Sequence, residues 1–315
     1  MIKSPICEML GISYPVFQGG MAWIADARLA ASVSEAGGLG LISSINTSTD
    51  AVKEQIRLCK TLTDKPFGVN IMLMAPNAAE VADLVIEEGV KVVTTGAGSP
   101  AVYMDKWKAA GIKVIPVVAS TAHAQKAQAA GADALIAEGA ESGGHIGDLH
   151  TMALVPQIVE AVDIPVLAAG GIYDGRGLAA ALMLGACGVQ MGTRFLCAQE
   201  CLVHEVYKER LIKAGDIGTI VTGKTMGDAV RCLKNPFSRK FAKMEMDPSV
   251  PREELAKVGV GTLKKAVVDG NFAEGSFLAG EVAGLIRRVE PAADIVRDVV
   301  EGAESILKSK VSLIF

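Results

Sequence analysis

Eight short apolar segments alternate with segments of helical periodicity over the first two-thirds of the chain. Most of them show little polar alternation, which is typical of parallel strands covered on both faces. They span residues 14–19, 38–44, 66–73, 91–98, 113–120, 132–139, 165–172 and 188–196. The helical segments include residues 27–36, 50–62, 78–88, 122–130, 151–162 and 177–184. Since a (β/α)8 TIM barrel requires this alternation, we predict an α/β fold of that kind, with a doubly wound parallel sheet as the alternative.

The alternation stops at about residue 216. Residues 216–277 are more polar and richer in lysine and arginine, and residues 278–315 are again apolar and helical. We therefore predict two domains. Residues 1–215 and 278–315 form the barrel, against which residues 291–308 pack as an amphipathic helix. Residues 216–277 form a smaller inserted α+β domain near the C-terminus that covers the active site.

Charge and hydropathy exclude several classes of protein. The chain has 31 basic and 35 acidic residues, a net charge of −4, which argues against a nucleic-acid or membrane-surface partner. No apolar run reaches the roughly 18 residues that span a bilayer. Residues 1–7 lack the apolar core of a signal peptide, so we expect a cytoplasmic protein. The six cysteines form no CxxC pair, and we expect reduced thiols and no metal site, even where Cys197, Cys201 and His204 could share a helix face.

A glycine-rich run after the sixth predicted strand carries the most informative side chain. Ser142, Gly143 and Gly144 lead from that strand to His145. Catalytic groups of parallel α/β proteins lie at this end of the strands. A lone loop histidine more often caps a helix or faces water. The role of His145 therefore depends on what the neighbouring strand ends carry.

Two further loops predict a bound phosphate, because the loops after the seventh and eighth strands of a barrel commonly hold one. The seventh strand ends at Gly170 and Gly171, and the eighth leads to Gly192 and Thr193. Glycines let backbone N–H groups approach phosphate oxygens closely, and Thr193 adds a hydroxyl donor. We therefore expect a phosphorylated cofactor here rather than a metal ion.

The ends of other strands offer partners for a flavin ring. Gly20, Met21 and Ala22 follow the first strand, Asn70 lies in the third, and Glu138 ends the sixth. A flavin needs amide and backbone partners for its polar edge and an apolar wall for its faces. Met21, Ala22 and Asn70 meet that need, although core packing alone would account for Met21.

Residues 96–101 fit the GxGxxA pattern of a dinucleotide-binding turn, directly after a predicted strand. Such a turn needs an acidic residue about twenty positions further on. Residues 116–120 read PVVAS instead. We therefore expect a loop of the barrel rim at this place rather than a Rossmann site.

The motifs at these strand ends together resemble a known family. The GGMA turn at 19–22, the EGAESGGH run at 138–145, the AGGI run at 169–172 and the QMGTRF run at 190–195 carry the resemblance. They are similar to the FMN-dependent barrel family that contains the nitronate monooxygenases (2-nitropropane dioxygenases) and the flavin-dependent enoyl-[acyl-carrier-protein] reductases II. The match runs in order over nearly the whole chain, and the sequence looks closest to the reductase branch, FabK.

The resemblance implies reduction of the trans-2 double bond of enoyl-acyl carrier protein in bacterial type II fatty-acid synthesis. Hydride would pass from NADH to FMN to the β-carbon, and His145 would protonate the α-carbon or polarise the thioester carbonyl. The alternative is a nitronate monooxygenase, in which His145 takes a proton beside the nitro group and alkyl nitronates are oxidised with O2 via FMN. A monovalent cation, whose ligands the sequence does not identify, is a further implication. The implied FMN-binding residues are Gly20, Met21, Ala22, Asn70, Glu138, Ser142, Gly143, Gly144, Gly170, Gly171, Gln190, Met191, Gly192 and Thr193.

The charge pattern of residues 224–243 favours the reductase. This segment has six basic residues against one acidic residue, Asp228. Acyl carrier protein is strongly acidic, and a basic rim would steer its approach, whereas a nitroalkane oxidase has no use for one. A solvated helix face is the plainer alternative. We expect acyl carrier protein as the partner and a homodimer as the assembly. The basic residues are Lys224, Arg231, Lys234, Arg239, Lys240 and Lys243.

Overall fold

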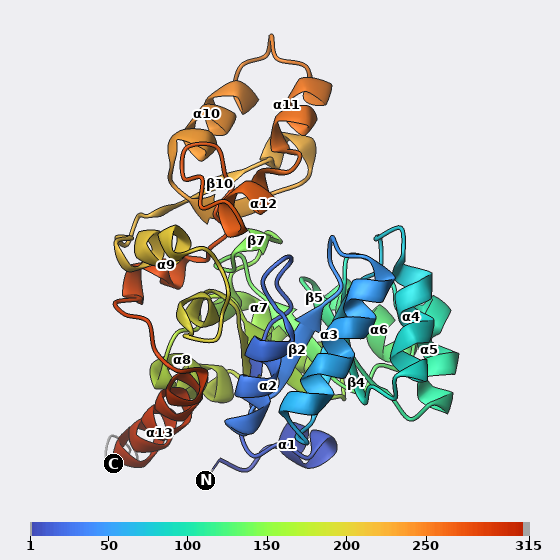
Figure 1. Ribbon diagram of the computed structural model, residues 1–315. Coiled ribbons are helices and arrows are strands. Elements are labelled where there is room, and N and C mark those ends of the chain that lie inside the picture. Colours follow the sequence, from blue (N-terminus) through green and yellow to red (C-terminus); the bar gives the residue numbers. More distant parts are fainter. Residues whose placement is uncertain (1, 311–315) are drawn as a thin grey trace.

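The computed structural model describes residues 2–310. Residues 1 and 311–315, which belong to the two predicted barrel ranges, lie outside the described residues. Eight parallel strands lie at the centre of the molecule, one in each predicted segment (Figure 1). They are β1 (Val16–Gln18), β2 (Gly40–Ser43), β3 (Phe67–Met72), β4 (Val92–Gly96), β5 (Lys113–Val118), β6 (Leu135–Glu138), β8 (Val166–Ala169) and β9 (Gly188–Met191).

The eight strands form a ring. Their order is β1-β9-β8-β6-β5-β4-β3-β2, and the two strands at its ends meet each other. Gln18 N–H donates to Leu39 O at 2.9 Å, and Leu39 N–H donates to Val16 O at 2.9 Å. Because a doubly wound sheet has two free edges, this closure shows that the predicted alternative is wrong and that the TIM barrel is correct.

Helices cover the outside of the ring. Each of them follows a loop that leaves the carboxyl end of a barrel strand, and an aspartate or serine caps four of the seven helices named below. Asp26 Oδ1, for example, accepts from Leu29 N–H at 2.9 Å. The covering helices are α2 (Ala27–Glu35), α3 (Thr49–Leu62), α4 (Ala78–Glu87), α5 (Ala101–Ala109), α6 (Thr121–Ala129), α7 (Thr151–Ala161) and α8 (Gly175–Met183).

The inside of the barrel is closed at the amino ends of the strands. Helix α1 (Pro5–Leu10) places Ile6 and Leu10 in one apolar cluster with the interior side chains of the strands. Figure 1 shows α1 at this end, opposite the loops that carry the predicted site. Access to the interior is therefore confined to the carboxyl ends.

The segment in which the alternation stops has a different architecture. Strands β10 (Thr219–Thr222) and β11 (Val230–Leu233) pair antiparallel, and β11 also pairs with β7 (Gly144–His145). Figure 1 shows these elements beyond the carboxyl end of the barrel. The predicted domain limits of 216 and 277 stay a prediction. The remaining elements from β9 to the last loop are η1 (Thr193–Cys197), α9 (Glu205–Ile212), η2 (Lys224–Met226), α10 (Pro236–Glu245), α11 (Arg252–Gly259), α12 (Thr262–Val267) and η3 (Glu281–Leu285).

The last helix returns to the barrel. Helix α13 (Ala292–Lys310) packs against α8 and α2, and its buried face includes Ile295, Val299 and Ala303. The predicted amphipathic helix at 291–308 is thereby confirmed. Among residues 2–310, none of the helices is both long and apolar enough to cross a membrane.

The contact between α2 and β2 has no room for a side chain at Gly40. A Cβ there would lie 1.9 Å from Ala30 O, which belongs to the helix backbone. We predict that Gly40→Ala lowers the free energy of unfolding by at least about 2 kcal/mol, because backbone must move to admit the methyl group. Gly215 has open space around its Cα and is the control. In denaturant unfolding, Gly215→Ala should stay within about 0.5 kcal/mol of the wild type. Equal stability of the two variants would contradict this account.

Candidate active site

Side chains that point into the barrel change from apolar to polar toward the carboxyl ends of the strands. Interior residues lie two apart, because side chains alternate along a strand. Leu41 and Ile136 belong to the apolar interior cluster, and the next interior positions are Ser43 and Glu138. The apolar core thus ends in a polar layer at the mouth. Its members are Ser43, Asn70, Thr94, Glu138 and Gln190.

The register of the strands arranges the side chains of the polar layer in two groups. Ser43, Asn70 and Thr94 are neighbours across β2, β3 and β4, and Asn70 Nδ2 donates to Thr94 Oγ1 at 2.9 Å. Glu138 and Gln190 flank Ala169 across β6, β8 and β9. The predicted residues Asn70, Glu138 and Gln190 therefore face one space from opposite sides of the ring.

The turn after β1 lies over the same space. A Cβ on Gly20 would lie 2.3 Å from Asn70 Cγ, and Met21 Sδ lies 3.6 Å from the Cβ position of Gly192. The structure therefore brings together four of the predicted cofactor residues, from β1, β3 and β9. Ala22 lies in the same turn, and Met191 is buried on the outer face of β9.

Gln190 carries an unsatisfied polar atom. Its side chain is 7% exposed, and Oε1 has no hydrogen-bond partner among the described residues. A buried amide oxygen without a donor is costly. The N–H at the polar edge of a flavin would supply the missing donor, so this part of the site fits the ring of FMN.

Glu138 lies in the polar layer without a cationic partner in the described part of the chain. Its only hydrogen bond there comes from Ser142 Oγ, 3.0 Å from Oε1. Burial raises the pKa of Glu138 to about 7, against a usual value of 4.5. The carboxyl therefore changes charge close to neutral pH.

The predicted phosphate loop after β8 is built from left-handed backbone. Gly170 and Gly171 have φ angles of +89° and +72°, which non-glycine residues rarely adopt. A Cβ on Gly170 would lie 2.7 Å from Gly139 O. The backbone conformation therefore requires glycine at both positions. Gly171 is exposed, so its backbone is accessible to a phosphate.

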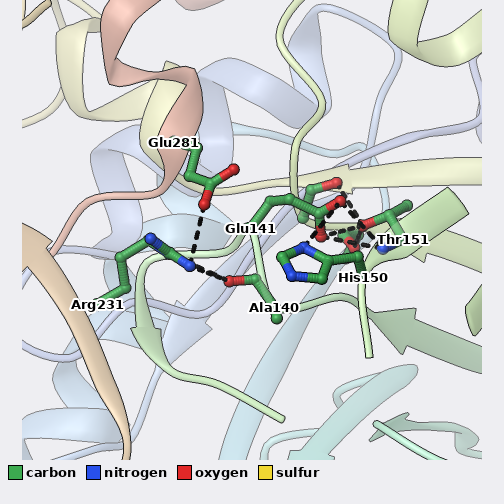
Figure 2. Close-up of polar contacts among 8 residues, drawn as sticks. Ala140, Glu141, His150, Thr151, Arg231 and Glu281 are labelled. Atoms are coloured by element: carbon green, nitrogen blue, oxygen red, sulfur yellow. Dashed lines mark hydrogen bonds and ion pairs between the residues drawn. The ribbon is translucent and has the colours of Figure 1, made fainter. Parts of the chain in front are cut away.

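A network of hydrogen bonds joins this loop to the run that precedes His145 (Figure 2). Thr151 Oγ1 donates to Glu141 Oε2 at 2.9 Å and lies 2.9 Å from Gly170 O. The Glu141 carboxylate also accepts from Thr151 N–H, at the start of α7. Figure 2 shows His150 beside Glu141, with Nδ1 at 3.7 Å from Oε1. Glu141 therefore fixes the loop after β6 relative to the loop after β8.

Arg231 holds the same loop from the other side. Its Nε and Nη2 donate to Ala140 O at 3.1 and 3.0 Å, and Nη2 pairs with Glu281 at 3.1 Å (Figure 2). The side chain is buried. The prediction that Arg231 belongs to a basic surface is therefore wrong. Its charge is directed at the barrel, because β11 pairs with β7 and turns this residue inward.

His145 lies on β7 rather than in a free loop, opposite Val230 of β11. Its imidazole is 69% exposed, and Nε2 lies 2.9 Å from Asp228 Oδ1. Sequence reasoning counted Asp228 only as a charge and missed this pairing, because the two residues are more than eighty positions apart. No local pattern could have revealed the contact.

Two predicted residues pack against the chain where it returns from β11 to η3. A Cβ on Gly143 would lie 2.7 Å from the backbone of Ala279, and Thr193 Oγ1 accepts from Gly280 N–H at 2.9 Å. The hydroxyl proton of Thr193 is thus not used in this hydrogen bond and is available to an acceptor such as a phosphate oxygen. Among the described residues, His145 has a side-chain ion pair with Asp228, and no hydrogen bond or ion pair links it to the polar layer.

The loop after β4 has the geometry of a barrel rim. Residues 96–100 connect β4 to α5 within a TIM barrel, so the GxGxxA pattern marks no Rossmann unit. Ala97 has a φ angle of +53°, and the non-glycine residues Trp23 and Asn46 also have positive φ angles. All three follow the carboxyl ends of strands. Strained backbone of this kind is typical of functional sites.

Fold and site together have the features of a flavin-dependent barrel oxidoreductase. A polar layer faces the mouth, an amide oxygen lacks a donor, and two glycine loops lie at the phosphate positions. Comparison with known proteins gives the family. The nitronate monooxygenase family model matches residues 3–302, so the chain belongs to this family, whose members are FMN-dependent oxidoreductases.

Three relatives illustrate the range of the family. The structure of FabK from Thermotoga maritima is 46% identical, covers 100% of both chains and has a TM-score of 0.97. The (3aS,4S,5R,7aS)-5-hydroxy-7a-methyl-1-oxo-octahydro-1H-indene-4-carboxyl-CoA dehydrogenase of Mycobacterium tuberculosis is 36% identical over 99% of each chain. A probable nitronate monooxygenase of Staphylococcus saprophyticus is 32% identical over 97% of this chain and 99% of its own.

Titration of Glu138 makes the stability of the protein depend on pH. Between pH 4.5 and about 7 the folded protein holds a proton that the unfolded chain has released. Stability from this group is therefore full below pH 4.5 and is lost as the pH rises through 7. We predict that the flavin-free wild type loses about 2 kcal/mol more of its free energy of unfolding between pH 5 and pH 8 than Glu138→Gln does, because glutamine does not titrate. Denaturant unfolding at both pH values measures this difference.

Glu253, an exposed carboxylate on α11, provides the control. Glu253→Gln should leave the pH dependence of unfolding as it is in the wild type. If Glu138→Gln also leaves it unchanged, the carboxyl of Glu138 does not titrate near neutral pH.

Proposed function

We propose that this protein is an FMN-dependent enoyl-[acyl-carrier-protein] reductase that uses NADH. The observation that carries the proposal is the likeness to FabK from Thermotoga maritima, at 46% identity over the whole of both chains. The probable nitronate monooxygenase, in contrast, is 32% identical. The overall reaction converts an enoyl thioester, NADH and one proton into the saturated thioester and NAD+.

A second relative supports a thioester as substrate. The name of the Mycobacterium tuberculosis protein, which is 36% identical, describes a dehydrogenase of a carboxyl-CoA compound. Family members with this barrel thus include an enzyme that acts on a thioester. The similarity over 99% of both chains is consistent with a substrate of that class for the present chain.

The residues of the site divide into two functional groups. FMN, when bound, supplies hydride transfer between NADH and the β-carbon of the substrate. Asn70, Gln190 and the turn at Met21 orient the ring from the polar layer, and the loops at Gly171 and Thr193 hold the phosphate. His145, on β7, delivers a proton to the α-carbon from its exposed imidazole.

Asp228 orients His145 for this role. The carboxylate lies 2.9 Å from Nε2 and fixes the direction of the ring. A carboxylate in this position orients the imidazole of a histidine that donates a proton and equally of one that accepts it, so the pairing fits both reactions.

Acyl carrier protein is the proposed carrier of the substrate. Helix α10 exposes Arg239, Lys240 and Lys243 on the segment that stands beyond the barrel mouth. These side chains, with exposed Lys224, would attract an acidic partner. Arg231 makes no contribution, because it is buried. A homodimer and a monovalent cation stay predictions, and we assign no ligands to the cation.

The two half-reactions test the function. We predict that NADH reduces the flavin of the purified holoprotein under argon and that crotonyl thioester then reoxidises it. In His145→Ala, reduction by NADH should proceed as in the wild type, whereas reoxidation by the thioester should slow by about 10²- to 10⁴-fold, as for loss of a general acid. Stopped-flow absorbance of the flavin measures both rates.

Three outcomes would contradict the proposal. If thioester never reoxidises the reduced flavin, the protein is not an enoyl reductase. If NADH leaves the flavin oxidised while alkyl nitronate and O2 are consumed, the protein is a nitronate monooxygenase. If His145→Ala reoxidises at the wild-type rate, His145 takes no part in proton transfer.

Charge reversal on α10 tests the carrier. We predict that Arg239→Glu combined with Lys240→Glu raises KM for enoyl-acyl carrier protein by about 10-fold or more, because rim charges steer association. The KM for a small enoyl-CoA thioester should stay unchanged. Steady-state kinetics with both substrates measures the two values. A control variant, Lys53→Glu on α3, reverses a charge on the outside of the barrel and should affect neither. Equal losses on both substrates would point to misfolding of the segment.

A further inference from the structure

Arg194 is a buried cation with unused hydrogen-bond donors. Its side chain is 2% exposed, and Nη2 pairs with Glu290 Oε2. Nε and Nη1 have no acceptor among the described residues. A buried guanidinium normally has its donors satisfied, because each unpaired donor carries its full desolvation cost. Two of the three guanidinium nitrogens of Arg194 therefore lack an acceptor.

The position of Arg194 relates it to both predicted phosphate loops. It directly follows Thr193, at the end of the loop after β9. Its guanidinium carbon lies 4.5 Å from the ring centroid of Tyr173, which follows Gly171 by two residues in the loop after β8. The aromatic face attracts the charge but offers no acceptor in the plane of the N–H groups. Arg194 thus contacts both loops, and its Nε and Nη1 groups, which donate in the plane of the guanidinium, have no acceptor.

The charges around Arg194 do not cancel. Glu290 pairs with Arg194 through Oε2 and with Arg288 through Oε1, so one carboxylate serves two guanidinium groups. The Arg288 side chain is 77% exposed, and solvent screens its charge. The three groups together therefore carry one net positive charge, and Arg194 is the buried one of the two cations. A further anion at the free donors of Arg194 would compensate this charge.

We propose that Arg194 is the buried cation that balances the phosphate monoester of the bound cofactor. The inference rests on the flavin site proposed above, and it adds a charge partner behind the backbone donors of the two glycine loops. Backbone N–H groups can hold a phosphate by hydrogen bonds, but they carry no net charge against its two negative charges. Arg194 supplies that charge from a place where water does not screen it.

Riboflavin provides the test, because it has the ring of FMN and lacks the phosphate. We predict that Arg194→Gln weakens binding of FMN to the flavin-free protein by about 10- to 100-fold, the range for hydrogen bonds to charged groups. The Kd for riboflavin should stay within a factor of about two. Quenching of flavin fluorescence measures both constants, and circular dichroism monitors the fold.

Two variants serve as controls. Arg288→Gln removes the exposed cation that shares Glu290 and should leave both Kd values unchanged. Arg194→Lys retains the charge and should lose less FMN affinity than Arg194→Gln does. This second variant keeps the proposal testable if the glutamine variant fails to fold, because Arg194→Lys must still weaken FMN more than riboflavin.

The outcomes separate this inference from the function. Parallel losses for FMN and riboflavin in Arg194→Gln would overturn it, since they indicate a purely structural role with Tyr173 and Glu290. A wild-type protein that binds riboflavin as tightly as FMN would overturn it too. If FMN binding depends on Arg194 but the holoprotein fails to reduce enoyl thioesters, the inference stands and the proposed reaction is wrong.

Discussion

The two hydrogen bonds from Arg231 to Ala140 O are the contact on which the site geometry depends. They are buried and charge-assisted, and they tie the segment after β9 to the loop that ends in His145. On its other side the same loop is held by Glu141, whose carboxylate accepts from Thr151, and Thr151 Oγ1 also lies 2.9 Å from Gly170 O. The run that ends in His145 and the loop after β8 therefore keep fixed positions relative to each other. Because two nitrogens of one buried guanidinium donate to the same carbonyl oxygen, the two segments are held rigidly together.

Apolar and polar side chains occupy separate layers inside the barrel. Interior side chains are apolar up to Leu41 and Ile136 and polar one step further, so a cofactor that needs both an apolar support and amide partners finds them only at the mouth. His145 lies outside this layer and is open to solvent. In the proposed reaction the substrate would enter between the two. The proton donor would then meet it from the side of the segment that contains β11.

One scaffold of this kind serves more than one reaction. The polar layer and the glycine loops concern the cofactor and say little about the substrate, which is why relatives with different names share the whole length of this chain. In this chain the partner of His145 is Asp228, on the segment that also exposes the basic residues of α10. In the proposed function, substrate choice and proton transfer would therefore depend on one structural unit.

The sequence by itself determined the barrel, because its predicted strands are apolar on both faces and alternate with helical segments. All eight strands lie within the predicted segments, and Asn70, Glu138 and Gln190 meet at the mouth since strand periodicity alone aims them inward. The tertiary structure decided where the charges go. The sequence around Arg231 predicts an exposed cation, yet the pairing of β11 with β7 buries this side chain against Ala140. The same pairing brings Asp228 close to His145. Pairing between strands more than eighty residues apart leaves no local pattern, so only the folded chain could reveal these contacts.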